Sequence, residues 1–346
     1  MATTSLTAAP FARASVRAPR RSSRSASTTT TTTTRASGEN SATIAGKNSP
    51  AFVDAVSGEW EGHSVYFDAA GTPIALPRNV VPPAFAEWGV ELVDWQSQCA
   101  MRADDDAKEI YARELRFLPT VGCEADASTV ESAIERRVAF DDVTPAPPGD
   151  DAPGGGNGVE FGSYSAGPGS LAARDGEETT IVMEHALAFT TGSGEDAKRT
   201  RLRLRQTISP VDGAIESIVG WKEYWYEPFN DAASLCSSCG GPNKWGETLA
   251  TDPAATVSGP GWRGDDWRGL SDAAVMLREG VWSDRAVLPD GGGVVYQIGW
   301  HIPDRDAVYL PPCREVETHL VSEREYDGDG NFVGAKFMKL TRPAPK

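Results

Sequence analysis

The chain has 346 residues and carries a formal net charge of −16 at pH 7. No apolar run approaches the roughly 20 residues that a membrane-spanning helix needs, so no transmembrane segment is predicted. Nucleic-acid binding is not expected either, because affinity for nucleic acids rests mainly on Lys and Arg side chains that neutralise phosphates.

The N-terminal segment differs in composition from the rest of the chain. Residues 1–48 contain seven basic residues and one acidic residue among many Ser, Thr and Ala residues. An Arg-rich, Ser-rich and acid-poor start without an apolar core is typical of an organellar transit peptide. We predict a disordered transit peptide over residues 1–47, with an attached basic tail as the alternative. The many hydroxyl side chains favour the chloroplast, in the stroma or peripheral to the thylakoid, over the mitochondrion.

Residues 48–228 are predicted to form a first β-barrel that begins with a short helix. Pro50 suits the first turn of a helix and Gly58 suits its end, and the alternation from Gly62 to Asp68 predicts the first strand. The Pro- and Gly-rich residues 144–177 predict a flexible loop with one short strand at 159–164. Further strands are predicted over residues 89–101, 108–121, 179–191, 198–209 and 214–227.

Residues 229–280 are predicted to be a Gly- and Pro-rich connector that ends in a helix over residues 270–280, capped by Ser271 and stopped by Gly280. A C-terminal β-unit then occupies residues 281–346. It is either a second, incomplete barrel or the completion of the first. Its strands are predicted over residues 281–289, 292–300, 314–326 and 331–340.

Many short strands with few helices indicate an all-β fold, and an antiparallel set of this length is expected to close into one or two barrels that leave few exposed edges. Residues 204–222 and 321–339 each consist of a strand, an Asp-Gly turn and a strand. This echo indicates either two related β-units or the general likeness of hairpins.

The short helix followed by Gly58-Glu59-Trp60 resembles the start of lipocalins and other calycins. Together with residues 58–74, 287–293, 297–302 and 324–343, it resembles a calycin-like family of cyanobacteria and plastids whose domain has no known function. Members of that family can carry two barrel-like units, but this chain has no Gly-x-Trp-Gly opening after residue 230.

The resemblance implies an antiparallel barrel whose closed end is filled by Trp60, with Gly58 leaving room for the crossing chain. It also implies a basic side chain over the indole, where a cation is attracted to the ring. Arg342 is the residue that we assign to this role. Other candidates are Arg201, Arg203, Arg205, Lys222 and Lys339.

Aromatic side chains on an inward strand face would line a pocket for a planar or hydrophobic ligand, and core filling is the alternative interpretation. His301, at a strand end, is the histidine best placed to reach such a ligand. The candidate ligand-binding residues are therefore Trp95, Trp221, Trp225, Trp300 and His301.

Cys236 and Cys239 form the only close cysteine pair. A second Cys-x-x-Cys or a spaced His pair, which would complete a zinc site, is missing from the sequence. The pair is either two plain loop thiols or a redox switch. No catalytic motif is recognisable, and the sequence identifies no cofactor and no protein partner.

These features predict a plastid protein that binds a small hydrophobic or pigment-like ligand without transforming it. One alternative is a lyase- or isomerase-type helper that acts on a tetrapyrrole or carotenoid. An acid–base pair inside the barrel would favour this alternative, whereas an apolar lining would favour binding. The other alternative is a filled-barrel scaffold or assembly protein that acts through its surface.

Overall fold

The computed structural model describes residues 50–121, 129–147, 162–172, 180–191, 198–236, 267–302 and 316–343. They belong to one compact unit. Among them no helix is long and apolar enough to cross a membrane. The predicted transit peptide, residues 1–47, lies outside the described residues.

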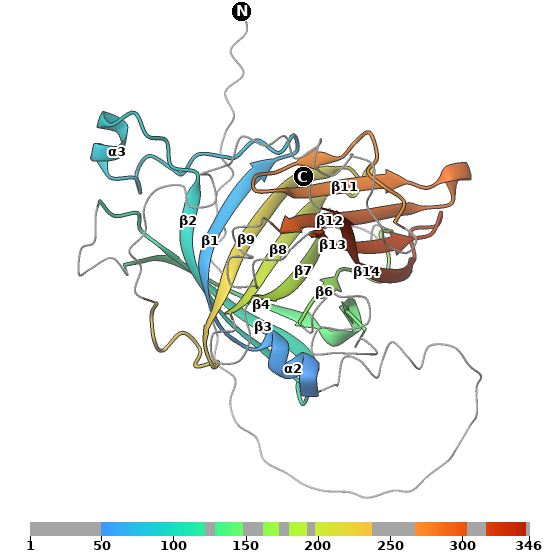
Figure 1. The fold of residues 1–346 in the computed structure, drawn as a ribbon, viewed down its shortest axis with the longest axis horizontal. Helices are drawn as coiled ribbons and strands as arrows, with labels where there is room; N and C mark the ends of the chain where they lie inside the picture. The colour runs from blue at the N-terminus through green and yellow to red at the C-terminus, as the bar shows by residue number, and fades with distance from the viewer. Residues whose placement is uncertain are drawn as a thin grey trace, which may run out of the picture. The chain divides into compact units, whose positions relative to one another are not determined.

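The described residues form two antiparallel sheets, which confirms the all-β fold class (Figure 1). Sheet 1 has nine strands in the order β4-β3-β2-β1-β9-β8-β7-β6-β5, and sheet 2 has five strands in the order β10-β11-β12-β13-β14. The strands of sheet 1 are β1 (Gly58–Asp68), β2 (Asp94–Asp104), β3 (Glu109–Phe117), β4 (Val130–Ala139), β5 (Val143–Pro145), β6 (Tyr164–Ala166), β7 (Ile181–Thr191), β8 (Lys198–Ile208) and β9 (Ile215–Glu227). Those of sheet 2 are β10 (Val275–Met276), β11 (Val281–Val287), β12 (Val294–Ile302), β13 (Val316–Tyr326) and β14 (Phe332–Pro343).

The alternation of side chains along β8 separates the two faces of sheet 1. Arg201, Arg203 and Arg205 point to one face, which we call the inner face, and Leu202 and Leu204 point to the outer face, because successive strand residues project to opposite sides. Both leucines are fully buried. Both faces of this charged strand are therefore covered by other parts of the protein.

Sheet 1 curls until its distant strands touch through side chains. Arg136 on β4 lies 3.0 Å from the Glu184 carboxylate on β7, and Arg203 on β8 lies 3.1 Å from Glu114 on β3. Within the described residues no backbone ladder joins β4 to β5. Ion pairs on the inner face, rather than main-chain hydrogen bonds, thus connect the two ends of the sheet.

Sheet 2 packs against the outer face of sheet 1. Leu202 and Leu204 share one buried cluster with Ile298, Trp300 and Leu320, and Figure 1 shows β11 to β14 as a separate sheet beside the curled one. No ladder among the described strands joins the two sheets. The C-terminal strands therefore add a layer and do not extend sheet 1.

Two short helices flank the inner face. The predicted first helix is confirmed as α2 (Pro50–Val56), whose Phe52 and Val56 pack with Trp60 at one end of that face. The second helix, α3 (Pro83–Glu87), lies in the segment between β1 and β2. Figure 1 shows α2 and α3 at opposite ends of the curled sheet.

The helix predicted over residues 270–280 is wrong. The segment forms a turn at 272–273, the short strand β10 and a second turn with left-handed backbone at Glu279 and Gly280. Ser271 does not cap a helix; its backbone N–H donates to the buried Asp284 carboxylate over 2.9 Å. Pairing of β10 with β11 overrides the local cap signals.

Two further elements differ from the sequence prediction. The sequence does not predict β4, because seven of its ten residues are exposed and four are charged, and such a strand lacks a clear apolar alternation. The short strand expected at 159–164 is β6, over residues 164–166, and β5 pairs with it.

Candidate functional site

The base of the inner face is built around Trp60, which is 1% exposed. Its indole N–H donates to the Val56 carbonyl of α2 over 3.2 Å. The guanidinium of Arg201 lies 4.0 Å from the ring centroid and that of Arg199 lies 5.2 Å away. The cation over the indole therefore comes from β8.

Of the other two residues predicted to close the barrel, Gly58 lies next to Trp225 on sheet 1, whereas Arg342 belongs to sheet 2. Gly58 has a φ of +146°, and a Cβ there would lie 2.4 Å from the Trp225 indole nitrogen, so only glycine lets the two strands approach. Arg342 pairs with Glu317 in the backbone register of sheet 2. Its side chain lies outside the described part of the structure.

A layer of buried ion pairs lies above Trp60. The Glu223 carboxylate accepts hydrogen bonds from Arg201 Nε over 2.6 Å and from Arg203 Nη2 over 2.8 Å. These three side chains are at most 2% exposed. Such a charge cluster is stable only when each member is paired, because burial of a lone charge is very costly.

Two further carboxylates complete this layer. Glu114 lies 2.7 Å from Arg136 and 3.1 Å from both Arg203 and Arg205. Burial opposes ionisation of Glu114, but the three guanidinium groups outweigh it and lower its pKa to about 2. Glu184 lies in the same field of arginines, which also hold its pKa well below the usual value despite its burial.

Two other titratable groups of this layer, the Cys99 thiol and the Tyr164 hydroxyl, have pKa values far above 7. Burial raises the pKa of the Cys99 thiol to about 12. Burial also raises the pKa of Tyr164, whose hydroxyl donates to Glu184 over 2.7 Å. A general acid or base works best with a pKa near the operating pH, so these described groups are poorly suited to proton transfer.

The solvent-reachable end of the inner face combines cations with apolar and aromatic side chains. Arg205 and Arg136 are 17% and 21% exposed in their side chains, and Ile134 and Val182 are 37% and 41% exposed. Arg116 donates to the Tyr66 hydroxyl and lies 5.0 Å from that ring. We call this surface the mouth patch: Tyr66, Arg116, Ile134, Arg136, Val182 and Arg205.

The segment between β1 and β2 covers one side of the mouth patch. Leu76, Phe85 and Leu92 form a cluster with Trp95, and Tyr66 packs against it. Trp95 is only 5% exposed as a result. The segment thus provides an apolar wall next to Arg116, which lies 5.9 Å from the Trp95 ring.

The structure separates the predicted ligand-binding residues into three places. Trp95, Trp221 and Trp225 lie on the inner face, and Arg203 and Arg205 each lie 4.6 Å from the Trp221 ring. Trp300 packs between the two sheets against Phe189, with 6.5 Å between ring centroids. His301 lies in β12 beside His319, on the face of sheet 2 that is turned away from sheet 1.

Sequence reasoning missed the acidic half of the ion-pair layer. Each of Glu114, Glu184 and Glu223 lies within a strand and has no acidic neighbour two residues away on the same face. A single acid among apolar, aromatic or basic neighbours is the signal that the sequence offers. It also missed a second Gly-x-Trp, Gly280-Val281-Trp282, at the start of β11. Trp282 is fully buried and its indole N–H donates to His319 Nε2 over 2.8 Å.

Cys236 is held in a buried position on the outer face of sheet 1. The Glu59 carboxylate accepts the backbone N–H groups of Asn230 and Ala232 over 2.9 and 3.2 Å, and Gln98 accepts that of Cys236 over 2.8 Å. Burial raises the thiol pKa to about 12. Cys239 lies outside the described residues.

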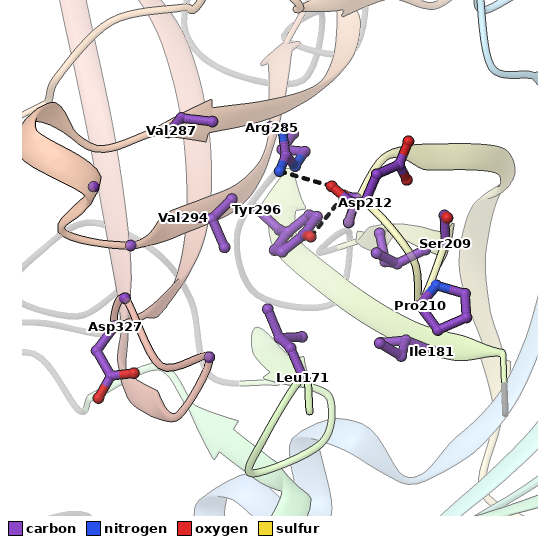
Figure 2. A pocket seen from close by; sticks show the side chains of 16 residues that line it. Leu171, Ile181, Ser209, Pro210, Asp212, Arg285, Val287, Val294, Tyr296 and Asp327 are labelled. Carbon is purple, nitrogen blue, oxygen red and sulfur yellow. Dashed lines mark hydrogen bonds between the residues drawn. The ribbon is translucent and has the colours of Figure 1, made fainter. Parts of the chain in front are cut away.

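A separate pocket of about 290 Å³ lies where three hairpin turns meet (Figure 2). The turns join β8 to β9, β11 to β12 and β13 to β14. Arg285 donates to the Asp212 carbonyl over 3.1 Å and the Tyr296 hydroxyl donates to the Gly213 carbonyl over 2.7 Å. Both Asp-Gly hairpins of the sequence echo, 204–222 and 321–339, contribute lining residues.

No protein-family model matches the chain, and no curated protein matches it. A solved structure of a protein of unknown function from the DUF3598 family of Nostoc punctiforme aligns with 85% of this chain and 98% of its own, at 14% identity and a TM-score of 0.43. By the strand pairing and side-chain contacts of its described residues, this chain is an antiparallel β protein with a curled, ion-paired sheet and a second sheet packed on its outer face.

Proposed function

We propose that the protein binds a small acidic molecule with an apolar or ring-containing body at the mouth patch and does not transform it. The observation that carries this proposal is the group of three solvent-reachable guanidiniums, Arg116, Arg136 and Arg205, in a chain with a net charge of −16. Arg116 lies 5.0 Å from the Tyr66 ring and 5.9 Å from the Trp95 ring. Arginine is the residue best suited to hold a carboxylate, since its planar fork donates two parallel hydrogen bonds.

The charges of the patch favour an acidic ligand over a purely hydrophobic one. Three cations face two carboxylates, Glu114 and Glu184, which are 4% and 5% exposed in their side chains. The ligand-facing surface therefore keeps a positive excess. A pigment-like ligand fits this surface if it carries a carboxylate for the arginines and a ring for the aromatic wall.

The protonation states of the inner face support binding without chemistry. Its described carboxylates have lowered pKa values and its described thiol and Tyr164 have raised ones. A lyase or isomerase would need a group that exchanges protons near neutral pH.

The test uses protoporphyrin IX, a ring with two carboxylates, and its dimethyl ester, which keeps the ring and removes both charges. We expect the acid to bind and the ester to bind at least about tenfold more weakly, which corresponds to roughly 1.4 kcal/mol. Absorption spectroscopy and native mass spectrometry measure the binding of the acid and of the ester. Equal binding of acid and ester would contradict the role of the arginines.

A matched pair of variants locates the site. Arg116→Gln removes a cation of the mouth patch, whereas Arg113→Gln removes one from the outer face of the same strand. We expect only Arg116→Gln to weaken binding of the acid, and neither to change binding of the ester. Identical affinities of the two variants for the acid would exclude the mouth patch.

A scaffold function is the second candidate, because the inner face below the mouth patch is filled by side chains. Arg203 and Glu223, for example, are at most 1% exposed. In that case the protein would act through its surface, and no small acid would bind in the experiment above.

We also propose chloroplast targeting by residues 1–47, on the basis of their composition alone. A fusion of these residues to a fluorescent protein should enter isolated chloroplasts and be shortened there. A fusion that stays outside the chloroplasts would contradict the targeting proposal and would leave the binding proposal for the mouth patch unchanged.

A further inference from the structure

We propose that the pocket between the three hairpin turns is a docking site for a basic segment of a partner protein that inserts one large apolar side chain. This surface is separate from the mouth patch, and the inference does not depend on the proposed function. It rests on the size and walls of the pocket, on the charge of its rim and on the exposed apolar residues beside it.

The pocket suits a single side chain. Its volume of about 290 Å³ lies at the bottom of the range for small-molecule sites, which is roughly 300–1,000 Å³. The walls come from both sheets and from the segment after β6: Leu171, Ile181, Ile208 and Val294. Figure 2 shows Leu171, Ile181 and Val294 turned toward the same space.

The rim of the pocket is acidic. Asp212 and Asp327 line it, and Asp329 is exposed on the same turn as Asp327. The Ser209 hydroxyl bound to Asp212 and the Asn331 backbone N–H bound to Asp327 lower the pKa values of the two carboxylates. Both are therefore ionised at neutral pH.

Arg285 is the one cation among the lining residues, and it is engaged inside the pocket. Its Nη2 donates to the Asp212 carbonyl, as Figure 2 shows. Two lining carboxylates thus outnumber one guanidinium. This rim favours a cationic partner and disfavours anionic lipid surfaces and nucleic acids.

Apolar contacts extend beyond the pocket. Val287 on the rim is 62% exposed and Val211, at the tip of the β8–β9 turn, is 92% exposed. A Cβ at Gly291 would meet nothing within 4 Å, so the main chain of a bound segment can approach there. An apolar anchor in a pocket, surrounded by complementary charge, is the usual arrangement of an interface hot spot.

Three peptides test the proposal with the full-length protein. The probes are acetyl-Lys-Lys-Leu-Lys-Lys-amide, the same peptide with Ala in place of Leu, and acetyl-Glu-Glu-Leu-Glu-Glu-amide. We expect shifts of the Gly213, Gly291 and Gly328 amide signals in ¹⁵N NMR spectra with the first peptide. Its affinity should exceed that of the Ala peptide about fivefold or more, as loss of a buried side chain predicts.

The acidic peptide should cause no shifts. Binding of the acidic peptide, or equal affinity of the Leu and Ala peptides, would overturn the proposal, since charge or apolar attraction alone would then explain the result. Shifts confined to the mouth patch would overturn it as well.

Two variants with the same added charge give the matched control. Val287→Lys places a cation on the rim, whereas Val333→Lys places one on β14 at a residue that is 60% exposed and does not line the pocket. We expect Val287→Lys to weaken binding of the basic Leu peptide about fivefold or more and Val333→Lys to leave it nearly unchanged. Equal affinities of the two variants would place the binding site elsewhere.

Discussion

Arg203 on β8 and Glu223 on β9 are diagonal neighbours on the inner face of sheet 1 and form an ion pair through two hydrogen bonds. Nη2 and Nε of the arginine each lie 2.8 Å from a different carboxylate oxygen. Both residues are at most 1% exposed. A second arginine, Arg201, pairs with the same carboxylate, so one buried acid is shared by two buried arginines.

Removal of this acid should destabilise the fold strongly. Glu223→Gln keeps the shape of the side chain but removes the negative charge that pairs with the buried Arg201 and Arg203. Breaking a buried ion pair typically costs about 3–5 kcal/mol. Urea unfolding measures the free energy of unfolding. Glu216→Gln, at an exposed position of the same strand, is the control and should change it by less than about 0.5 kcal/mol. Similar values for both would mean that the buried pair contributes no net stability.

The stability contributed by Glu114 should be lost in acid. Its pKa in the folded state is about 2, below the value of about 4.3 for an unfolded chain. A lowered folded-state pKa stabilises the protein above the unfolded pKa, and this contribution disappears as the pH falls from about 4.3 through about 2.

The measurement compares unfolding temperatures of the wild type and Glu114→Gln across this range. We expect the wild type to have the higher unfolding temperature at neutral pH, and we expect the difference between the two proteins to become smaller toward pH 2. Glu135→Gln, at an exposed position of β4, is the control and should have nearly the same unfolding temperature as the wild type at every pH. A gap between wild type and Glu114→Gln that stays constant with pH would refute the assignment.

The Cys236 thiol should be unreactive in the folded protein. It is 1% exposed and its pKa is raised to about 12, and the thiolate is the reactive form. Peptide mass spectrometry after treatment with iodoacetamide should show it unlabelled in the native state and labelled in urea. Rapid labelling of Cys236 in the native protein would show that residues 228–236 do not hold this thiol in a buried position.

Glu59→Gln offers a sharper version of this experiment. The variant weakens the carboxylate that holds the Asn230 and Ala232 backbone groups. Labelling of Cys236 should accelerate, whereas labelling of Cys99, which is buried on the inner face, should not. Equal acceleration at both cysteines would indicate general loosening of the fold.

Gly299 should not tolerate a side chain. A Cβ at this position would lie 2.2 Å from the Trp282 ring, and overpacking of a core typically costs about 1–3 kcal/mol. Gly299→Ala should therefore lower the free energy of unfolding by at least that amount. Gly334→Ala, where a Cβ meets nothing within 4 Å, is the strand control and should be close to neutral. A neutral Gly299→Ala would show that the Trp282 ring can move.

Local patterns were sufficient for most of the strands. The alternation of Arg and Leu along β8 and the Asp-Gly turn before β9 are contained within a few residues, so they predict a hairpin with two distinct faces. The helix predicted at 270–280 failed because its cap signals were equally local. Its Val275 and Met276 found partners on β11 instead.

The amino-acid pattern was enough to predict the all-β class, the short helix before Trp60 and the acidic balance of the chain. The three-dimensional fold was needed to show that Arg203 contacts Glu114, 89 residues earlier, that Trp300 and His301 lie away from the inner face, and that three separate turns surround one pocket. The physical reason is that side-chain alternation fixes which face a residue occupies, whereas the curl of the sheet, which arises from all its strands together, fixes what that face meets.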